Sequence, residues 1–339
     1  MRKIFLLRHG RPDFPLGTRP CLGHTDLPLG ALGRMQACRA ARWLASKQFE
    51  AVYASPLKRA VETAKYCSDD LRILPDLREI DCGDWDGLDF EEIQRRWPEL
   101  YAARGKDLSL PMPNGETVDA VRERAQRALQ QILAETTGDV LIVAHSFVIR
   151  TLLGDLNCRL PYASVTVLGD PECVGFVPEE PLTELLAEAL LKAAAPGEKI
   201  QAHCHAVAKE ALRIAERLPM KLDTALLVSA ALLHDVARAE QHHAETGAAW
   251  LRDLGYSAAA EIIEQHHDFA GTTLNEAAIL YLADKCVLED RVIPLAERFT
   301  ASEAKCRTEE AKKAHARRQK AAERLREEVN TLCQTEVVR

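Results

Sequence analysis

LLRHGRP, at residues 6–12, ends a short apolar run with an arginine and a histidine side by side. Two later apolar runs, at residues 51–54 and 140–144, also stop abruptly and lead into helical patterns. Short buried runs that alternate with helices are typical of βα units, which build a mostly parallel sheet with helices on both of its faces. We therefore predict an α/β fold for the first half of the chain.

Basic side chains follow all three of these apolar runs. Arg8 and His9 come directly after the first run. Arg59 lies one helical turn after the second, and His145 directly follows the third. The carboxyl ends of strands in an open α/β sheet line its binding crevice, and helix N-termini there favour anions. Any one of these residues alone would be read as a surface residue, but together they predict a phosphate site, because guanidinium groups bind phosphate oxygens bidentately.

The same half of the chain is similar to one known family over about 140 residues. LLRHGRP resembles the signature of the histidine phosphatase superfamily, in its phosphoglycerate mutase-like branch. The supporting motifs follow in the family's order: CLGHTDLPL at 21–29, SPLKRAVETA at 55–64, LREIDCGDWDG at 77–87, NGET at 114–117 and VAHS at 143–146.

The resemblance implies a role for each polar residue of the crevice. His9 would be the nucleophile that accepts a phosphoryl group, and Glu79 would donate a proton to the leaving group. Arg8, Arg59 and His145 would hold the phosphate, with His145 also counted among the catalytic groups. The implied reaction is hydrolysis of a phosphomonoester through phosphohistidine, which splits one displacement into two easier steps. It needs no metal, because arginines supply the positive charge.

Two departures from the family's pattern concern the rim of this pocket. Members usually have a glycine after the second histidine, whereas this chain has Ser146 followed by the bulky Phe147. The segment after His145 is also short. Both changes could reshape the rim and leave the chemistry intact. A mutase would usually carry more chain around the pocket, so we favour a phosphatase.

The chain changes character at residues 169–181, GDPECVGFVPEEP, which are rich in proline and glycine and lack periodicity. Beyond them nearly everything is helical, and seven of the eleven histidines fall between His203 and His267. We expect an all-α second domain whose terminal helix is charged, solvated and weakly packed on the body. The predicted organisation is an α/β domain at 1–170, a linker at 171–181, a helical domain at 182–299 and a charged C-terminal helix at 300–339.

Helical spacing separates inward from outward histidines in the second half. Four histidines and two aspartates fall on apolar faces or helix ends that point inward: His203, His234, Asp235, His243, His266 and Asp284. A lone histidine there is usually a satisfied core residue, but six such groups are too many unless something binds them. Imidazole with carboxylate suits Fe, Mn, Zn or Ni, and six ligands are enough for two divalent ions. Spacing leaves open which histidine of each doublet, 242/243 and 266/267, binds metal.

This second pattern resembles the HD superfamily of metal-dependent phosphohydrolases over residues 182–299. The family is named for an adjacent histidine and aspartate, which are His234 and Asp235 here. His243 and His266 fit the two extra histidines of the binuclear subgroup, which includes bacterial dinucleoside tetraphosphate hydrolases. The resemblance implies two ions that activate water and clamp phosphate oxygens.

Composition excludes some classes of function. The net charge of -7 argues against non-specific nucleic-acid binding. No apolar run approaches the ~20 residues that a membrane helix needs. The ten cysteines include no Cys-x-x-Cys pair, which favours reduced thiols and a cytoplasmic protein.

These features predict a two-domain phosphohydrolase, with a phosphohistidine phosphatase followed by a metal-dependent hydrolase of a phosphate ester or anhydride. Its partners would be small phosphorylated substrates, with nucleotides expected at the second site. An alternative keeps the phosphatase and makes the HD domain a nucleotide-binding sensor or docking module. A third, non-enzymatic reading as a binding scaffold must explain why both complete residue sets are present. Both substrates, the identity of the metal, a homo-oligomeric state and communication between the sites stay open.

Overall fold

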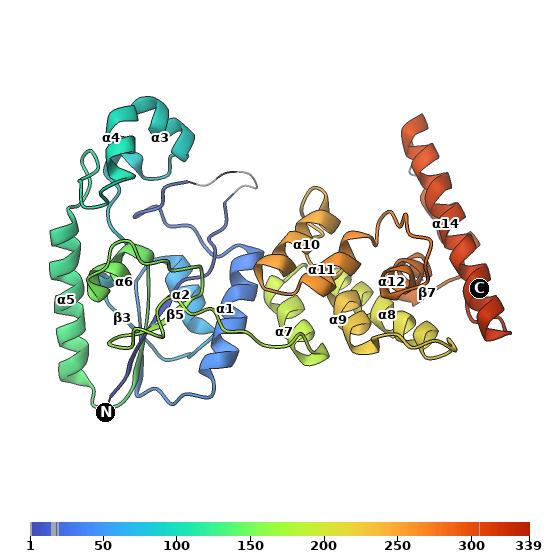
Figure 1. The fold of residues 1–339 in the computed structure, drawn as a ribbon, viewed down its shortest axis with the longest axis horizontal. Helices are drawn as coiled ribbons and strands as arrows, with labels where there is room; N and C mark the ends of the chain where they lie inside the picture. Colours follow the sequence, from blue (N-terminus) through green and yellow to red (C-terminus); the bar gives the residue numbers. More distant parts are fainter. Residues whose placement is uncertain (1, 15–17, 19, 305) are drawn as a thin grey trace. The chain divides into compact units, whose positions relative to one another are not determined.

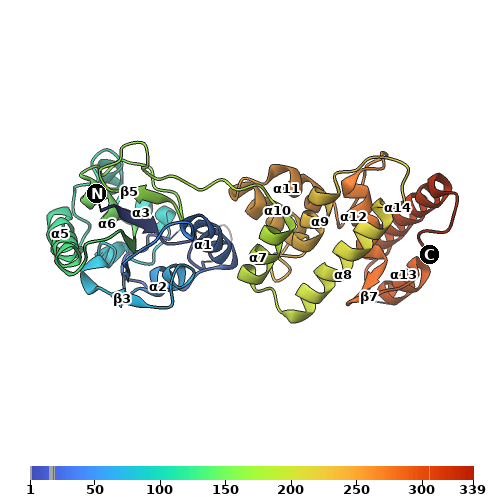
Figure 2. The same ribbon diagram turned by 90° about the horizontal axis from the view of Figure 1, so that it is seen from below.

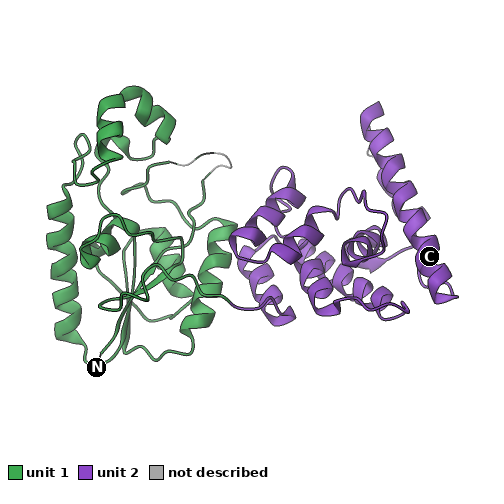
Figure 3. Cartoon of the chain, in the orientation of Figure 1, with its two compact units in different colours: residues 1–179 green, residues 180–339 purple. Residues whose placement is uncertain are grey.

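The computed structural model describes residues 2–14, 18, 20–304 and 306–339. The chain divides into two compact units, Met1–Glu179 and Glu180–Arg339, coloured separately in Figure 3. The first unit is α/β and the second is helical, as predicted for the two halves. Among the described residues, no helix combines the length and the apolar character needed to cross a bilayer.

A five-stranded sheet forms the centre of unit 1 (Figure 1). Its order is β3-β2-β4-β1-β5, with β1 at Ile4–Arg8, β2 at Ala51–Ala54, β3 at Leu71–Ile73, β4 at Val140–Ala144 and β5 at Val165–Val167. The pairs β1–β4, β2–β4 and β2–β3 are parallel, and β5 runs antiparallel to β1. Strands β2 and β4 are buried along their whole length, which is why their sequences are continuously apolar.

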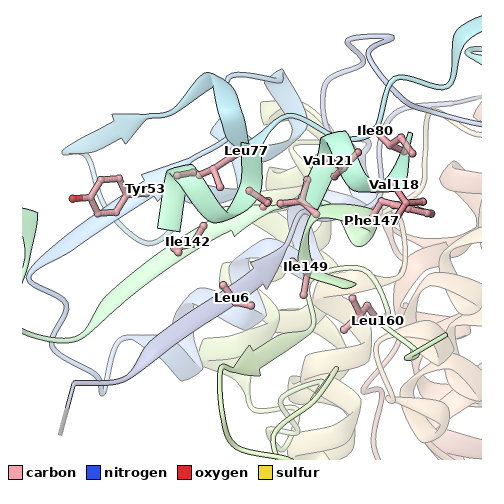
Figure 4. Packing of buried hydrophobic residues seen from close by; sticks show 14 of the residues in the cluster. Leu6, Tyr53, Leu77, Ile80, Val118, Val121, Ile142, Phe147, Ile149 and Leu160 are labelled. Carbon is pink, nitrogen blue, oxygen red and sulfur yellow. The ribbon is translucent and has the colours of Figure 1, made fainter. Parts of the chain in front are cut away.

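Helices cover both faces of this sheet. The helices of unit 1 are α1 (Ala31–Leu44), α2 (Lys58–Lys65), α3 (Phe90–Arg96), α4 (Pro98–Arg104), α5 (Val118–Glu135) and α6 (Ser146–Leu153). Two short 3₁₀ turns, η1 (Pro75–Leu77) and η2 (Gly83–Trp85), complete the unit. Alternate strand residues belong to opposite cores, because successive side chains in a strand point to opposite faces. Leu6, Tyr53 and Ile142 pack with α5 and α6 (Figure 4), whereas Leu7 and Val143 belong to the core on the other face.

Unit 2 is organised around one buried helix, α9 (Thr224–Leu233), whose last seven residues are all buried. Helix α9 packs against α7 (Glu184–Ala194), α8 (Glu198–Ala215), α11 (Ser257–Glu264) and α12 (Glu276–Lys285). The remaining elements are α10 (His243–Asp253), α13 (Leu295–Glu303), α14 (Glu309–Cys333), and the two-residue strands β6 (Val287–Leu288) and β7 (Arg291–Val292). This hairpin turns through Glu289 in the left-handed region, with φ 56°, and its strands are too short to show a period in the sequence.

The C-terminal helix differs from the solvated, weakly packed helix that the sequence predicted. Helix α14 buries four side chains along one stripe, His315, Ala322, Leu325 and Val329, and packs on α12 and α13 (Figure 2). The Tyr281 hydroxyl on α12 also donates a hydrogen bond to the Arg318 carbonyl, at 2.7 Å. The thin apolar stripe is therefore sufficient to attach the helix, because its members recur at helical spacing.

The chain after β1 passes very close to the start of α1, and two glycines make this possible. A Cβ atom at Gly33 would overlap the Arg11 carbonyl oxygen, and one at Gly10 would overlap the Gly33 carbonyl oxygen. Arg11 in turn accepts a hydrogen bond from the Gly30 amide at 3.1 Å. This close approach positions the segment that directly follows the first polar residues of the crevice.

We expect Gly33→Ala to loosen unit 1, because the added methyl group must displace the backbone of Arg11; overpacking of this kind costs about 1–3 kcal/mol. Hydrogen exchange measured by mass spectrometry should speed up in peptides from α1 and β1 and stay unchanged in residues 180–339. Gly30→Ala is the control, because its Cβ would lie 3.4 Å from the nearest atom. Exchange in Gly33→Ala as slow as in the wild type would contradict this account.

Candidate active site and candidate metal centre

The strand register of unit 1 brings the predicted phosphate-binding residues together. Arg8 on β1 pairs with Ala144 on β4, and Ala54 on β2 pairs with Val143. The residues that follow these three strand ends are His9, His145 and Ser55, so they come to one edge of the sheet. The rings of His9 and His145 have centroids 4.9 Å apart, and both are buried.

The imidazole of His9 is held in one tautomer. Its Nδ1 lies 2.7 Å from the Gly10 carbonyl oxygen, so Nδ1 carries the proton and donates it. The lone pair is therefore on Nε2. Burial, followed by the guanidinium groups of Arg59 and Arg8, holds the pKa of His9 well below its ordinary 6.5. His9 is thus uncharged at neutral pH, which is the form that can act as a nucleophile.

Two guanidinium groups lie in this crevice, and main-chain carbonyl oxygens orient them. Arg59 is almost fully buried and donates from Nη1 to Thr25 at 2.8 Å and from Nη2 to Gly23 at 2.7 Å. Arg8 donates to the Leu160 carbonyl at 2.5 Å and lies over the Tyr162 ring, 4.0 Å from its centroid. A carbonyl oxygen orients a guanidinium group without cancelling its charge, so both arginines stay cationic and suit a dianionic phosphate.

His145 adds a buried nitrogen that lacks a partner. Its Nε2 lies 2.7 Å from the Ser55 hydroxyl oxygen, whereas Nδ1 makes no hydrogen bond within the described part of the chain. Burial, followed by the charge of Arg59, lowers the pKa of His145 well below 6.5. Buried polar atoms of this kind are normally satisfied, so Nδ1 is available to a bound ligand.

The Glu79 carboxylate lies at the N-terminus of α6. It accepts hydrogen bonds from the Ile80 amide at 3.0 Å and from the Phe147 amide at 3.2 Å. Phe147 thus contributes its amide, while its side chain is buried in the core. The main chain at Glu79 is held independently, because Arg124 on α5 and His24 both bind its carbonyl oxygen, at 3.0 and 2.9 Å. Glu79 lines a cavity of about 450 Å3 together with Arg8, His9 and Tyr162.

The sequence analysis did not identify Ser55 and Tyr162 as site residues. Ser55 could have been found, because it follows β2 just as His9 follows β1 and His145 follows β4. Tyr162 carries no comparable signal. It lies in an irregular segment, and only the fold brings its ring to Arg8 and within 5.7 Å of the His9 ring.

In unit 2, all six predicted metal ligands lie in one place. They come from separate helices and helix ends: His203 from α8, His234 and Asp235 directly after α9, His243 from the start of α10, His266 after α11 and Asp284 from α12. Two sets of ligand atoms are close enough to hold an ion, namely His203, His234 and Asp284, and His234, Asp235 and His266.

Asp235 lies between the two halves of this cluster. Its Oδ2 faces His234 Nε2 at 3.8 Å, whereas its Oδ1 faces His243 Nε2 at 3.2 Å and His266 Nε2 at 3.5 Å. On the other side, Asp284 Oδ1 lies 3.1 Å from His203 Nε2 and 3.8 Å from His234 Nε2. The two oxygens of one carboxylate therefore point at two different groups of imidazoles.

The orientation of the imidazoles fits a metal site. In three of them Nδ1 donates to a main-chain carbonyl: His203 to Glu289 at 2.7 Å, His234 to Ala231 at 2.7 Å and His266 to Ile263 at 2.6 Å. The Nε2 lone pairs are thus directed into the cluster, and those of His234 and His266 are buried without a hydrogen bond among the described residues. Metal-bound histidines are typically oriented by such carbonyl contacts.

The protonation states fit a metal site as well. Burial lowers the pKa of His234 to about 4, so this imidazole is neutral at pH 7. Burial alone would raise the pKa of Asp235, but the imidazoles of His234, His243 and His266 together outweigh it and hold that pKa below its ordinary value. Neutral imidazole and ionised carboxylate are the forms that ligate metal.

The two histidine doublets differ in how their rings lie relative to the cluster. His242 is exposed and precedes α10 in a left-handed conformation, whereas His243 faces Asp235. In the second doublet both rings point toward the cluster. The His267 ring lies 4.9 Å from that of His243, and burial followed by Lys285 lowers the pKa of His267 to about 3. His267 is thus a further candidate ligand, in the doublet for which the sequence left the metal-binding histidine open.

A cavity of about 680 Å3 adjoins this cluster of candidate metal ligands. Basic side chains lining it include Lys199, Arg238 and Arg298. Arg238 contacts the cluster, with Nη1 3.0 Å from His243 Nε2 and 3.6 Å from Asp235 Oδ1. Helix α14 contributes His315 to the same wall.

Comparison with known proteins matches one family model to each unit. The chain belongs to the histidine phosphatase superfamily (branch 1), whose family model matches residues 4–169, and a second family model, the HD domain, matches residues 200–288. Its relatives include phosphatases, so the protein is a phosphoric ester hydrolase.

Three relatives resemble the N-terminal half. The chain is 32% identical to "Uncharacterized phosphatase PhoE" of Bacillus subtilis, over 46% of this chain and 78% of that protein. It is 37% identical to "Phosphoglycerate mutase-like protein 4" of Arabidopsis thaliana, over 44% of this chain and 69% of that protein. It is 32% identical to "Glucosyl-3-phosphoglycerate phosphatase" of Mycobacterium tuberculosis, over 50% of this chain and 80% of that protein.

We expect the imidazole signals of His9 to keep their neutral-form positions between about pH 7.5 and about pH 5.5, because burial and two arginines disfavour the cation. A solvent-exposed imidazole would go from about 10% to about 90% protonated over that range. NMR of the histidine-labelled full chain measures this directly, and the signals lost in His9→Asn identify the residue. A His9 signal that titrates near pH 6.5 would show that the site is more polar than described.

Proposed function

We propose that the protein carries two phosphohydrolase activities, one in each unit. Unit 1 would hydrolyse a phosphomonoester through a phosphohistidine on His9. Unit 2 would use a metal centre to hydrolyse a phosphate ester or anhydride of a nucleotide. The observation that carries this proposal is that each unit gathers its nitrogen and carboxylate groups beside one cavity. Arg8, His9 and Glu79 line the cavity of unit 1, and His203, Asp235, His266 and Asp284 line that of unit 2. The ten free cysteines support a cytoplasmic location.

In the first reaction, His9 Nε2 attacks phosphorus, so that an N–P bond forms and the P–O bond to the leaving group breaks. Glu79 gives its proton to the departing oxygen, and the same carboxylate later accepts a proton from the water that cleaves the N–P bond, which releases phosphate. Arg8 and Arg59 balance the charge on the transferring group, and His145 Nδ1 offers it a further contact. The lowered pKa of His9 supports this role, because no proton must leave before attack.

In the second reaction, the ligand set suits two divalent ions of Fe, Mn, Zn or Ni. His203, His234, Asp284 and Asp235 Oδ2 would hold one ion, and Asp235 Oδ1, His243 and His266 the other, because one imidazole nitrogen serves one ion whereas a carboxylate can bridge two. Bound ions supply Lewis-acid polarisation of phosphoryl oxygens and a lowered pKa for coordinated water. Main-chain carbonyl groups accept hydrogen bonds from Nδ1 of His203, His234 and His266, which orients their Nε2 atoms toward the cluster.

Size and charge support a nucleotide as the second substrate. The cavity beside the cluster, at about 680 Å3, is in the range that holds a drug-sized ligand. Lys199, Arg238 and Arg298 place positive charge around it, which suits a substrate with more than one phosphate group. For the first site, a small phosphorylated metabolite is supported by the phosphatases among the relatives.

We expect His9→Ala and Asp235→Ala to remove different activities. Both variants and the wild type would be assayed on phenyl phosphate, glycerol 3-phosphate, nucleoside phosphates and dinucleoside polyphosphates, with and without chelator. His9→Ala should lose chelator-resistant phosphate release by about a thousandfold or more and keep chelator-sensitive turnover. Asp235→Ala should show the reverse. If Asp235→Ala equals the wild type on every substrate, unit 2 is a nucleotide sensor or docking module instead.

We also expect the wild type to retain about two ions per chain after loading with Mn²⁺ or Fe²⁺ and desalting, because its ligands form two groups around Asp235. Elemental analysis by mass spectrometry counts them without reference to activity. Asp235→Asn should retain fewer, since it loses the carboxylate shared by both groups. His205→Ala is the matched control, because His205 lies on the same helix as His203 but is exposed and binds Glu188. No retained metal in the wild type would contradict the metal centre.

A further inference from the structure

His24 lies in the segment between β1 and α1 and contacts the main chain of the proposed proton donor. Its Nε2 atom is 2.9 Å from the Glu79 carbonyl oxygen. A carbonyl oxygen can only accept a hydrogen bond, so Nε2 carries the proton and donates it. His24 belongs to the motif at residues 21–29, yet its side chain has no part in the mechanism proposed above.

The residues on either side of His24 hold the side chain of Arg59. The carbonyl oxygens of Gly23 and Thr25 accept hydrogen bonds from Nη2 and Nη1 of the guanidinium group, at 2.7 and 2.8 Å. Arg59 is one of the groups proposed to bind the phosphate. One short segment therefore orients a phosphate-binding arginine through its main chain and contacts Glu79 through the side chain of His24.

The segment that carries His24 is itself held in place. The Asp86 carboxylate accepts hydrogen bonds from the amides of Gly23 and Thr25, at 2.8 and 2.7 Å, one on each oxygen. Hydrogen bonds to a charged group are shorter and stronger than neutral ones. Both neighbours of His24 are thus bound through their amide and their carbonyl groups, so the imidazole projects from a well-fixed main chain.

The main chain around Glu79 is attached to α5 by a different residue, Arg124. Its guanidinium group donates to the carbonyl oxygens of Asp76 at 2.8 Å, Arg78 at 2.5 Å and Glu79 at 3.0 Å. The Glu79 carbonyl oxygen therefore accepts two hydrogen bonds. One comes from α5, and the other comes from His24 on the segment that holds the phosphate-binding arginine.

This arrangement matters for general-acid catalysis, in which the proton donor must lie within hydrogen-bond reach of the leaving oxygen. The position of that oxygen depends on the phosphate group, which Arg59 would help to hold. The position of the proton depends on Glu79. A displacement of about 1 Å between two such groups can slow catalysis by about a hundredfold. A hydrogen bond that joins their two supporting segments therefore affects the rate.

We propose that His24 is a positioning residue, which fixes Glu79 relative to the phosphate group that Arg59 would hold. His24 is not among the described residues that line the phosphatase cavity, so it would act through the main chain of Glu79. The inference rests on the proposed phosphatase function and on Glu79 as its proton donor. Without the Nε2 contact, ester cleavage should slow for leaving groups that need a proton and change little for those that leave as stable anions.

Two substrates of similar size test the inference on the full chain. Benzyl phosphate and 4-nitrophenyl phosphate each carry one aromatic ring, but benzyl alcohol is a much weaker acid than 4-nitrophenol. The benzyl oxygen therefore needs a proton to leave, whereas 4-nitrophenolate leaves as an anion. The quantity to measure is kcat/KM for benzyl phosphate divided by kcat/KM for 4-nitrophenyl phosphate. A general loss of phosphate binding would lower both values and leave this ratio unchanged.

Glu79→Gln provides the reference and should lower the ratio by about a hundredfold or more, because it removes the general acid. His24→Asn should lower the ratio by about tenfold, because its amide nitrogen reaches only as far as imidazole Nδ1 and falls short of the Glu79 carbonyl oxygen. The amide nitrogen of glutamine is as many bonds from Cα as imidazole Nε2. His24→Gln should therefore keep the ratio within about threefold of the wild type.

Arg78→Met is the matched control. Arg78 is exposed and directly precedes Glu79 in the chain, and only its carbonyl oxygen takes part in the contacts described above. This variant should keep the wild-type ratio, because the main-chain hydrogen bonds around Glu79 do not depend on the Arg78 side chain.

The possible failures are distinguishable. A ratio in His24→Asn within about threefold of the wild type, or an equal loss in His24→Asn and His24→Gln, would overturn the positioning role and leave the phosphatase proposal standing. A wild-type ratio in Glu79→Gln would show that Glu79 is not the proton donor, and the inference would fail with that assignment. Turnover of 4-nitrophenyl phosphate that persists in His9→Ala would overturn the phosphatase proposal itself. If circular dichroism shows that His24→Asn does not fold, His24→Leu decides by the same criterion.

Discussion

A buried charge or imidazole nitrogen costs free energy unless a partner satisfies it, and both sites of this protein are built from such groups. In unit 1, His145 Nδ1 lies buried without a hydrogen bond in the described chain, close to the buried Arg59 and the partly buried Arg8. In unit 2, the Nε2 atoms of His234 and His266 are in the same situation. Burial of apolar side chains in the surrounding cores must offset this free-energy cost. Ligands or ions that complete the sites would recover it.

Hydrogen bonds to main-chain carbonyl groups orient many of these side chains. In unit 1 they orient His9, Arg8 and Arg59, and in unit 2 they orient His203, His234 and His266. A carbonyl oxygen fixes the direction of an N–H group but brings no formal charge, so the site keeps its electrostatic character. Unit 1 therefore presents fixed N–H donors that can still bind an anion. Unit 2 presents fixed imidazole lone pairs that can still bind a cation.

The polar groups of the two sites differ in charge: those of unit 1 suit an anion, and those of unit 2 suit a cation. Unit 1 supplies permanent positive charge through guanidinium groups, whereas unit 2 offers carboxylates and imidazole nitrogens that suit cations. Parts of the chain beyond the recognisable motifs complete both cavities. Helices α3 and α4 line the first with aromatic side chains and Arg104, and α13 and α14 line the second with Phe299 and His315.

The sequence by itself determined the α/β and helical halves, because strand and helix periods are local properties of the chain. It also identified His9, Arg59, His145 and the six groups of the second cluster as candidates, since strand ends and helix faces follow from the same periods. Only the tertiary structure brought Tyr162, His267 and Arg104 into the cavities, because these contacts join irregular segments or helix ends that no period relates. It likewise decided that α14 packs on α12, since burial depends on the partner surface as well as on the helix.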